Sequence, residues 1–177
     1  MTYKASISRE FGDKAQFAIS CVHEPFGSEP RYVYGRMCIR SGDKSLGDFH
    51  EPACMLNVTA SHLHGVLERL PNLSADVFSG LGEASIWETI DRAIYRNDDR
   101  PMEEIVADAG RFFQYDFLTN GGESFDKSKS FIFREDDKVS ILFIEDDKVL
   151  DSIVVSIDSF YSAVKGFLDW IDSGGTS

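Results

Sequence analysis

Cysteine is scarce in this chain. Its 177 residues include three, Cys21, Cys38 and Cys54, and no CxxC spacing occurs among them. An odd number leaves at least one thiol unpaired within a monomer. A chain of this length buries roughly 70% of its unfolded surface, so it needs no covalent staples. We therefore expect free, buried thiols in a protein of a reducing compartment.

Long apolar runs are also missing. The N-terminal residues 1–14, MTYKASISREFGDK, lack the apolar core of a secretory signal peptide. No apolar run elsewhere approaches the roughly 20 residues that span a bilayer. We expect a soluble, cytoplasmic protein with no membrane partner.

Basic residues are few compared with acidic ones. Lysine and arginine total 18 against 30 aspartate and glutamate, giving a net charge of −12. This balance disfavours direct binding of nucleic acid or anionic lipid and permits binding of a basic protein surface. The excess is uneven, at −3 over residues 1–88 and −9 over residues 89–177. An electrostatic partner is therefore expected at the second half.

Signatures of metal or cofactor binding are absent from the sequence. There is no zinc-ligand spacing and no glycine-rich loop that enters a helix. His62 and His64 form an HxH pair, but two helical residues at this spacing point about 200° apart. We expect no metal ion and no cofactor.

One local cluster leaves an enzymatic alternative open. Asp48, His50 and Glu51 place acid and base groups in a turn, and Cys54 lies nearby as an imaginable nucleophile. A nucleophile requires a base within hydrogen-bond reach and a third group that orients the base. The other interpretation is turn capping beside a buried thiol.

Periodicity predicts an α+β fold. Fourteen phenylalanines and a 42% hydrophobic fraction indicate a true core. Alternation and β-branched or aromatic enrichment predict strands at 15–22, 31–40, 111–118, 130–135, 138–145 and 148–157. Residues 24–30 are expected to form a turn, and 41–52 turns with one short strand. Helical spacing predicts helices at 57–70, 83–96, 101–110 and 157–171.

These elements predict a single α+β domain over residues 1–177. No βαβ alternation occurs, so the sheet is expected to be mainly antiparallel, with about six strands. The last four strands follow one another closely and predict a meander in the C-terminal half. The helices are expected to pack on one face.

An acidic pentapeptide, EDDKV, occurs at residues 135–139 and again at 145–149. Seven acids and two lysines lie between Glu135 and Asp151. In a meander the two turns lie at opposite ends of a strand roughly 25 Å long at ~3.3 Å per residue. A single binding surface therefore uses one turn only. The alternative is that both turns are simply solvated, since aspartate favours turns.

The link 119–130 is long for a hairpin and carries Phe125 between Glu123 and Asp126. Long loops are often binding elements. Phe125 has two interpretations: an exposed aromatic anchor for a partner, or a ring that folds back onto the core.

Residues 42–67 contain Leu46-Gly47-Asp48, Glu51-Pro52 and the segment from Leu56 to Leu63 that follows them. This stretch resembles the N-terminal part of small immunity proteins from bacterial polymorphic-toxin and contact-dependent growth inhibition systems. The resemblance implies an antidote that binds the toxic C-terminal domain of a cognate effector and neutralises it without chemistry. Many such toxins are nucleases with basic clefts, which an acidic inhibitor blocks by imitating the phosphate backbone.

The resemblance supplies no map of contacts, so the candidate site rests on charge. The partner-binding residues we expect first are Glu145, Asp146 and Asp147. The second set is Asp136, Asp137, Glu123 and Phe125. Fold maintenance is the role expected for GDFHEP, residues 47–52. The alternatives are an acidic interaction module without a toxin partner and a small enzyme. The oligomeric state stays open.

Overall fold

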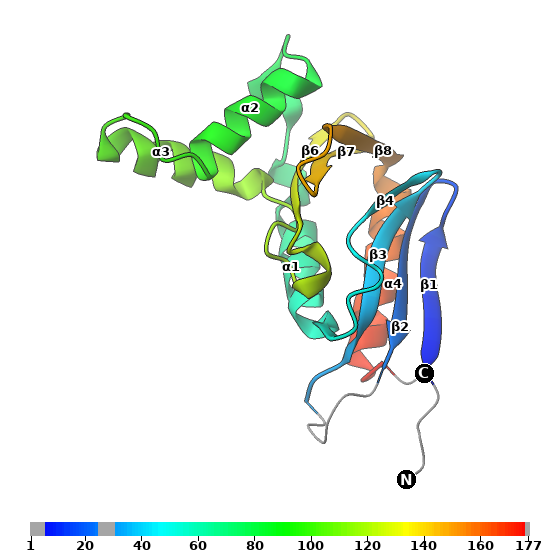
Figure 1. The fold of residues 1–177 in the computed structure, drawn as a ribbon. Helices are drawn as coiled ribbons and strands as arrows, with labels where there is room; N and C mark the ends of the chain where they lie inside the picture. The colour runs from blue at the N-terminus through cyan, green and yellow to red at the C-terminus, as the bar shows by residue number, and fades with distance from the viewer. Residues whose placement is uncertain (1–5, 25–30, 176–177) are drawn as a thin grey trace.

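The structure is a computed structural model that describes residues 6–24 and 31–175 (Figure 1). Apart from Glu24, the turn expected at 24–30 lies outside these residues. The described residues form two antiparallel sheets and four α-helices, with one continuous cluster of buried apolar side chains. The α+β class and the mainly antiparallel pairing are confirmed. The strands differ from the expectation in belonging to two sheets, of five and three strands.

The larger sheet contains β1 (Ile7–Asp13), β2 (Phe17–His23), β3 (Tyr34–Ser41), β4 (Lys44–Leu46) and β5 (Cys54–Met55). Its order is β1-β2-β3-β4, and β5 also pairs with β3. The expected hairpin of β2 and β3 is confirmed, with Ala18 opposite Arg40 and His23 opposite Gly35. The short strand expected within 41–52 is β4. Strand β1 was not expected from the sequence.

The smaller sheet contains β6 (Ser128–Glu135), β7 (Lys138–Glu145) and β8 (Asp151–Ser156). These strands pair in the order β6-β7-β8, which confirms the C-terminal meander. Strand β7 is central and mostly buried, as its unbroken apolar sequence indicates. Asp136, Asp146 and Asp147 at its two ends have positive φ angles of 51°, 47° and 56°. Aspartate tolerates this left-handed conformation, so the repeated pentapeptide suits both links.

Helix α4 (Ile157–Asp172) connects the two sheets through the core. It packs against β1 and β2 of the larger sheet and also contacts β7 and β8. The ring centroids of Phe160 and Phe17 lie 5.1 Å apart, and those of Phe167 and Phe11 lie 6.1 Å apart. Helix α1 (Leu56–Arg69) packs against both α4 and β3. The helical layer therefore holds the sheets in one relative position.

Helices α2 (Glu83–Ile94) and α3 (Met102–Phe112) project from the rest of the molecule as an arm (Figure 1). Two 3-10 turns, η1 (Leu70–Asn72) and η2 (Ala75–Phe78), lead from α1 toward α2. The arm attaches to β6 through aromatic contacts, since the Trp87 and Phe131 rings lie 4.6 Å apart. None of the described helices is both long and apolar enough to cross a membrane.

The strand expected at 111–118 was wrong. Residues 111–112 complete α3, and a 3-10 turn, η3 (Phe113–Tyr115), follows directly. A single bridge between Asp116 and Phe131 is the sheet-like pairing of this segment. The segment's aromatic side chains favour strands only weakly, and here Phe112 and Tyr115 instead join the ring of Phe78 in an aromatic cluster. Tertiary packing therefore outweighs the local preference.

Candidate partner-binding surface

The two acidic turns lie at opposite ends of β7, as the meander requires. Glu135 pairs with Lys138 at one end, and Ser128 pairs with Glu145 at the other. Asp136 and Asp137 are exposed, and the Asp137 carbonyl accepts a hydrogen bond from the Ile157 N–H at 2.8 Å. The Asp136 end therefore lies beside the start of α4. It shares no surface with the Glu145 end.

The Glu145 end opens onto a groove of about 600 Å³ between α2 and the smaller sheet. Its walls come from α2 and the link after it, from the adjoining ends of β6 and β7, and from the links before β6 and after β7. The lining residues are Trp87, Asp91, Arg96, Asp126, Lys127, Ser128, Lys129, Ile144, Asp146 and Asp147. Asp126, Asp146 and Asp147 are exposed. The side chains of these three form no ion pair or hydrogen bond with any residue that the structure describes. The fold thus adds Asp126 to the pair that sequence reasoning selected.

The basic side chains that line this groove already form ion pairs with carboxylates of the same chain. The Lys129 amino group lies 2.6 Å from Asp91 Oδ1, and Arg96 Nε lies 3.0 Å from Asp91 Oδ2. Lys127 Nζ lies 3.5 Å from Asp48 Oδ2. Since these cations are paired, the three free carboxylates give the groove an uncompensated negative field.

Glu145 and Glu123 are turned toward the protein. Glu145 Oε1 accepts a hydrogen bond from the Gly47 N–H at 2.5 Å, and Glu123 Oε2 accepts one from the Met55 N–H at 2.9 Å. Both side chains are half-buried. These carboxylates therefore tie the β6–β7 region to the segment that follows β4, a structural task that the charge argument did not anticipate.

Phe125 is not an exposed anchor. Its side chain is 0% exposed in the 3-10 turn η4 (Glu123–Phe125) and belongs to the core. The ring packs so closely under Gly47 that a Cβ there would lie 2.8 Å from Phe125 Cε1. Of the two interpretations that the sequence left open, the ring that folds back onto the core is confirmed. The interpretation of Phe125 as an exposed partner-binding anchor is wrong. A ring with no exposed surface has no area to offer a partner.

The Asp48–His50–Glu51 cluster is a structural turn. Asp48 Oδ1 accepts a hydrogen bond from the His50 backbone N–H at 2.9 Å, and its other oxygen faces Lys127. Cys54 is buried, and burial raises the pKa of its thiol, which is the opposite of an activated nucleophile. Cys21 and Cys38 are likewise free and buried, with pKa values raised by burial to about 12 and about 11. No group of three or more His, Cys, Asp or Glu side chains suited to a metal ion occurs within residues 6–24 and 31–175.

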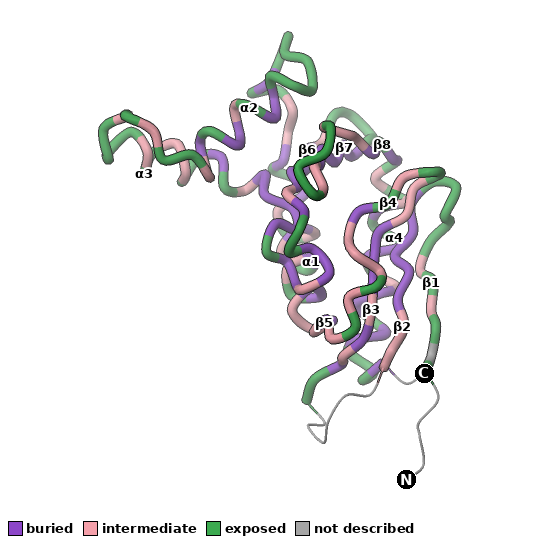
Figure 2. Tube along the Cα trace, in the orientation of Figure 1, coloured by how far each residue is buried: buried purple, intermediate pink, exposed green. Residues whose placement is uncertain are grey.

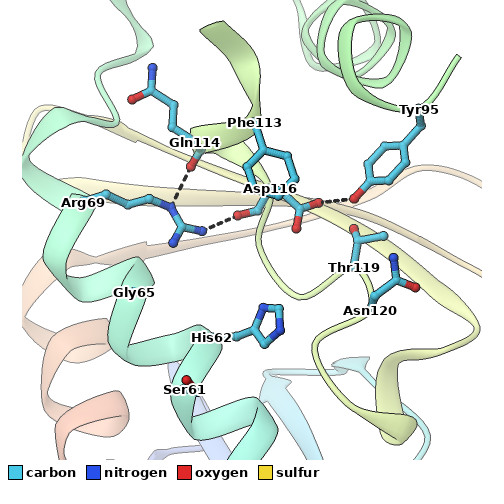
Figure 3. A pocket seen from close by; sticks show the side chains of 10 residues that line it. All are labelled: Ser61, His62, Gly65, Arg69, Tyr95, Phe113, Gln114, Asp116, Thr119 and Asn120. Atoms are coloured by element: carbon cyan, nitrogen blue, oxygen red, sulfur yellow. Dashed lines mark hydrogen bonds between the residues drawn. The ribbon is translucent and has the colours of Figure 1, made fainter. Parts of the chain in front are cut away.

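A second hollow, of about 510 Å³, lies where α1 meets the base of the arm (Figure 3). Asp116 is buried beside it, and the Tyr95 hydroxyl donates to Asp116 Oδ1 at 2.6 Å. Burial raises the pKa of the Asp116 carboxyl, although the Tyr95 hydrogen bond opposes the change. Arg69 donates to the backbone carbonyls of Gln114 and Asp116 at 2.8 and 2.6 Å. Its guanidinium is thus used to hold the chain after α3.

The HxH pair is divided between two surfaces. His62 extends into the second hollow from α1 (Figure 3). His64 lies on another side of the helix, with its Nδ1 3.7 Å from Glu68 Oε1. The two rings therefore do not share a site, in agreement with the helical spacing.

Comparison with known proteins decides the family. Residues 1–170 match the family described as immunity protein 42. The chain belongs to this immunity protein family. No curated protein matches this immunity protein in sequence. Among solved structures, its fold is similar to the crystal structure of CdiI from Burkholderia dolosa AUO158. The TM-score is 0.64 at 17% identity, over 91% of this chain and 99% of the other.

Family membership confirms the class of protein that the resemblance implied. An immunity protein neutralises a cognate toxin, and members of such families are typically not enzymes. This family assignment favours neither of the two alternatives, an interaction module without a toxin partner and a small enzyme.

Sequence reasoning found part of the acidic groove and missed the second hollow. Asp146 and Asp147 were selected for their charge in an acidic turn of the meander, which is a local pattern. Asp126 was noted only as a neighbour of Phe125. Tyr95 and Asp116 come together because the chain after α3 forms the turn η3 and not a strand. The one sign of this site in the sequence is a single aspartate within the aromatic run of residues 111–118.

Proposed function

We propose that this immunity protein neutralises its toxin by covering a basic surface of the toxic domain with the acidic groove. The contact is non-covalent and occurs in the cytoplasm, and a nuclease with a basic cleft is the toxin class that fits this charge. The observation that carries the proposal is the set of three exposed, unpaired carboxylates, Asp126, Asp146 and Asp147, on one groove. Complementary potential speeds encounter and disfavours wrong partners.

Among the residues expected from the sequence, the proposal keeps Asp146 and Asp147 as contacts. Glu145 and Glu123 act indirectly, because their backbone hydrogen bonds hold the groove in shape. Asp136 and Asp137 lie at the far end of β7, so they contribute only to the long-range field. The proposal thus assigns direct contact to the carboxylates at one end of β7 and only a long-range electrostatic effect to those at the other end. The two ends can therefore be compared by mutagenesis.

The test is the triple variant Asp126→Asn, Asp146→Asn, Asp147→Asn. Asparagine is chosen because positions 146 and 147 have positive φ, which asparagine tolerates, so the backbone is preserved. The binding partner is the cognate toxic domain, purified from the co-expressed complex. We expect the association rate to fall by about tenfold or more at low salt, with a weaker dependence on ionic strength.

The matched control is Glu135→Gln, Asp136→Asn, Asp137→Asn, which removes an equal number of negative charges from the turn at the opposite end of β7. We compare the two variants at an ionic strength of about 0.1 M, where the Debye length is about 10 Å. There the association rate of the control should stay within about threefold of wild type, because its charges lie roughly 25 Å away at the other end of β7. Growth protection against the toxin is measured in parallel for both variants. If the control loses binding and the groove variant does not, the contact surface is the other turn. If neither changes, the charge mechanism is wrong.

A further inference from the structure

Helix α3 carries a row of large apolar side chains that the fold leaves uncovered. Met102, Val106 and Phe113 are 70%, 63% and 61% exposed. At 100° per residue these three positions project within about 40° of one another on the helical turns of α3 and η3. Folding uses a different side of the helix, where Phe112 is buried. We call Met102, Val106 and Phe113 the α3 stripe.

The α3 stripe is held on a firm support although α3 lies at the outer part of the arm (Figure 2). Arg100, in the link before α3, has an almost fully buried side chain. It donates to Asp98 at 2.6 Å and to the Arg92 carbonyl at 2.7 Å, and it pairs with Asp108 of α3 at 2.5 Å. This fork fastens α3 to α2. A preorganised apolar surface loses little conformational entropy when a partner covers it.

The stripe ends at the second hollow. Phe113 forms part of the lining of that hollow together with His62 and Tyr95. The Tyr95 ring in turn lies under the Lys129 amino group, 4.7 Å from the ring centroid, and Lys129 lines the acidic groove. Stripe, hollow and groove therefore follow one another around α2. Phe113 joins the stripe to the hollow, and the contact between Tyr95 and Lys129 joins the hollow to the groove.

We propose that the α3 stripe is the apolar core of the toxin interface and that the acidic groove is its charged rim. This inference rests on the proposed function, and it adds which part of the immunity protein makes the apolar contacts with the toxin. The arrangement matches protein interfaces in general, in which an apolar core carries most of the binding energy and a polar rim surrounds it. The partner is a basic protein surface that bears an apolar patch.

Charge selects that partner over a second copy of this chain. Residues 83–112 contain eight acidic and four basic residues, a net charge of −4. Two arms placed face to face would bring like charges together at low separation. Glu103 lies in the first turn of α3 beside the stripe and forms no ion pair with a described residue, whereas Glu104 projects to the opposite side of the helix. Lysine or arginine on the toxin would pair with Glu103.

Core and rim leave different kinetic signatures. Removing rim charge slows encounter and alters salt dependence, whereas removing a buried apolar contact speeds dissociation. The test variant is Met102→Gln, Val106→Gln, Phe113→Gln, measured against the same toxin domain as above. We expect dissociation to accelerate by roughly thirtyfold or more. The association rate and its salt dependence should stay within about threefold of wild type.

The matched control is Tyr32→Gln, Val154→Thr, Tyr161→Gln, which replaces three exposed large side chains outside the arm. We expect wild-type dissociation from this variant. Thermal unfolding checks that the stripe variant is folded. Should the triple variant fail to fold, the single variants Met102→Gln and Val106→Gln replace it, since both side chains are mostly exposed.

The outcomes separate the two proposals. If the wild-type chain does not bind the toxin domain, the proposed function fails and this inference falls with it. If the wild type binds and the stripe variant dissociates at the wild-type rate, the stripe is not the core, while the acidic groove still stands. If sedimentation shows a wild-type dimer that the stripe variant loses with toxin binding unchanged, the stripe is a self-association surface, and the inference is overturned.

Discussion

A single glycine connects the motif behind the family resemblance to the tertiary structure. Gly47 has a φ of +101°, a region that side-chain-bearing residues rarely adopt. Its N–H donates to Glu145, and the space of its absent side chain is filled by the Phe125 ring. The Leu46-Gly47-Asp48 motif is therefore a packing requirement. Through the hydrogen bond from Gly47 to Glu145, it joins the turn after β4 to the Glu145 end of β7.

Gly47→Ala is expected to lower the free energy of unfolding by about 2–4 kcal/mol, because backbone strain and overpacking against Phe125 act together. Urea unfolding at neutral pH measures the loss. Gly42→Ala is the control, since Gly42 also has a positive φ of 60° but no atom lies within 4 Å of its added Cβ. That variant should lose only about 1 kcal/mol. Equal losses would show that the Phe125 contact does not matter.

At the scale of elements, the arm depends on one short link. Helices α2 and α3 meet at residues 95–101, and Arg100 occupies the centre of the joint with Asp98, Asp108 and the Arg92 carbonyl as acceptors. The helices share few buried apolar residues, because Phe112 is the one buried apolar side chain of α3 in the described structure. Polar contacts therefore set the position of the stripe.

Arg100→Ala is expected to loosen α3 without unfolding the rest of the molecule. Hydrogen exchange of residues 102–112 should accelerate, while amides of β7 keep their protection. Arg111→Ala is the control within the same helix, because that exposed side chain lies over the Phe112 ring and forms no ion pair with a described residue. If β7 exchanges faster as well, the arm is not a separable element.

The same joint has a defined response to pH. The Arg100 guanidinium, followed by that of Arg92, holds the pKa of the Asp98 carboxyl well below its usual range. A depressed pKa means that the contact contributes stability above the ordinary value of about 3.9 and loses it as pH falls through the depressed value. The protection difference between wild type and Arg100→Ala should thus persist at about pH 4 and disappear only in stronger acid.

At the scale of the whole molecule, α4 packs against both sheets, so we expect them to unfold as one cooperative unit. It buries Phe160, Val164, Phe167 and Leu168 between them. Lys44 of the larger sheet adds an ion pair to Asp151 of the smaller one at 2.6 Å. The free carboxylates of the acidic groove and the side chains of the α3 stripe are exposed, so these binding residues can change without loss of the fold.

Phe167→Ala tests this unity. Phe167 is fully buried against Phe11 and Trp170, so the truncation should cost about 3–5 kcal/mol. Reporters in β2 and β7 should show the same shifted unfolding midpoint, which separate two-dimensional NMR signals in a urea series measure. Different midpoints would mean that the sheets unfold independently.

Much of the fold was predictable because its signals are local. The apolar stripe of α4, the helices at 57–70 and 83–96, and the short acidic links of the meander each depend on residues close in sequence. Strand β1 was missed because its ISREFGD sequence alternates weakly and carries charge. The segment 111–118 was assigned wrongly because its aromatic residues favour strands in isolation, while the contact with Phe78 is distant in sequence.

The sequence by itself determined the α+β class, the separation of the two acidic turns and a net charge suited to a basic partner. These follow from periodicity, strand geometry and composition, which need no knowledge of distant neighbours. Only the tertiary structure decided which carboxylates are free. Glu145 and Glu123 are bonded inward, Phe125 is buried under Gly47, and Asp126 joins Asp146 and Asp147. Pairing and burial are long-range contacts, and no local pattern encodes them.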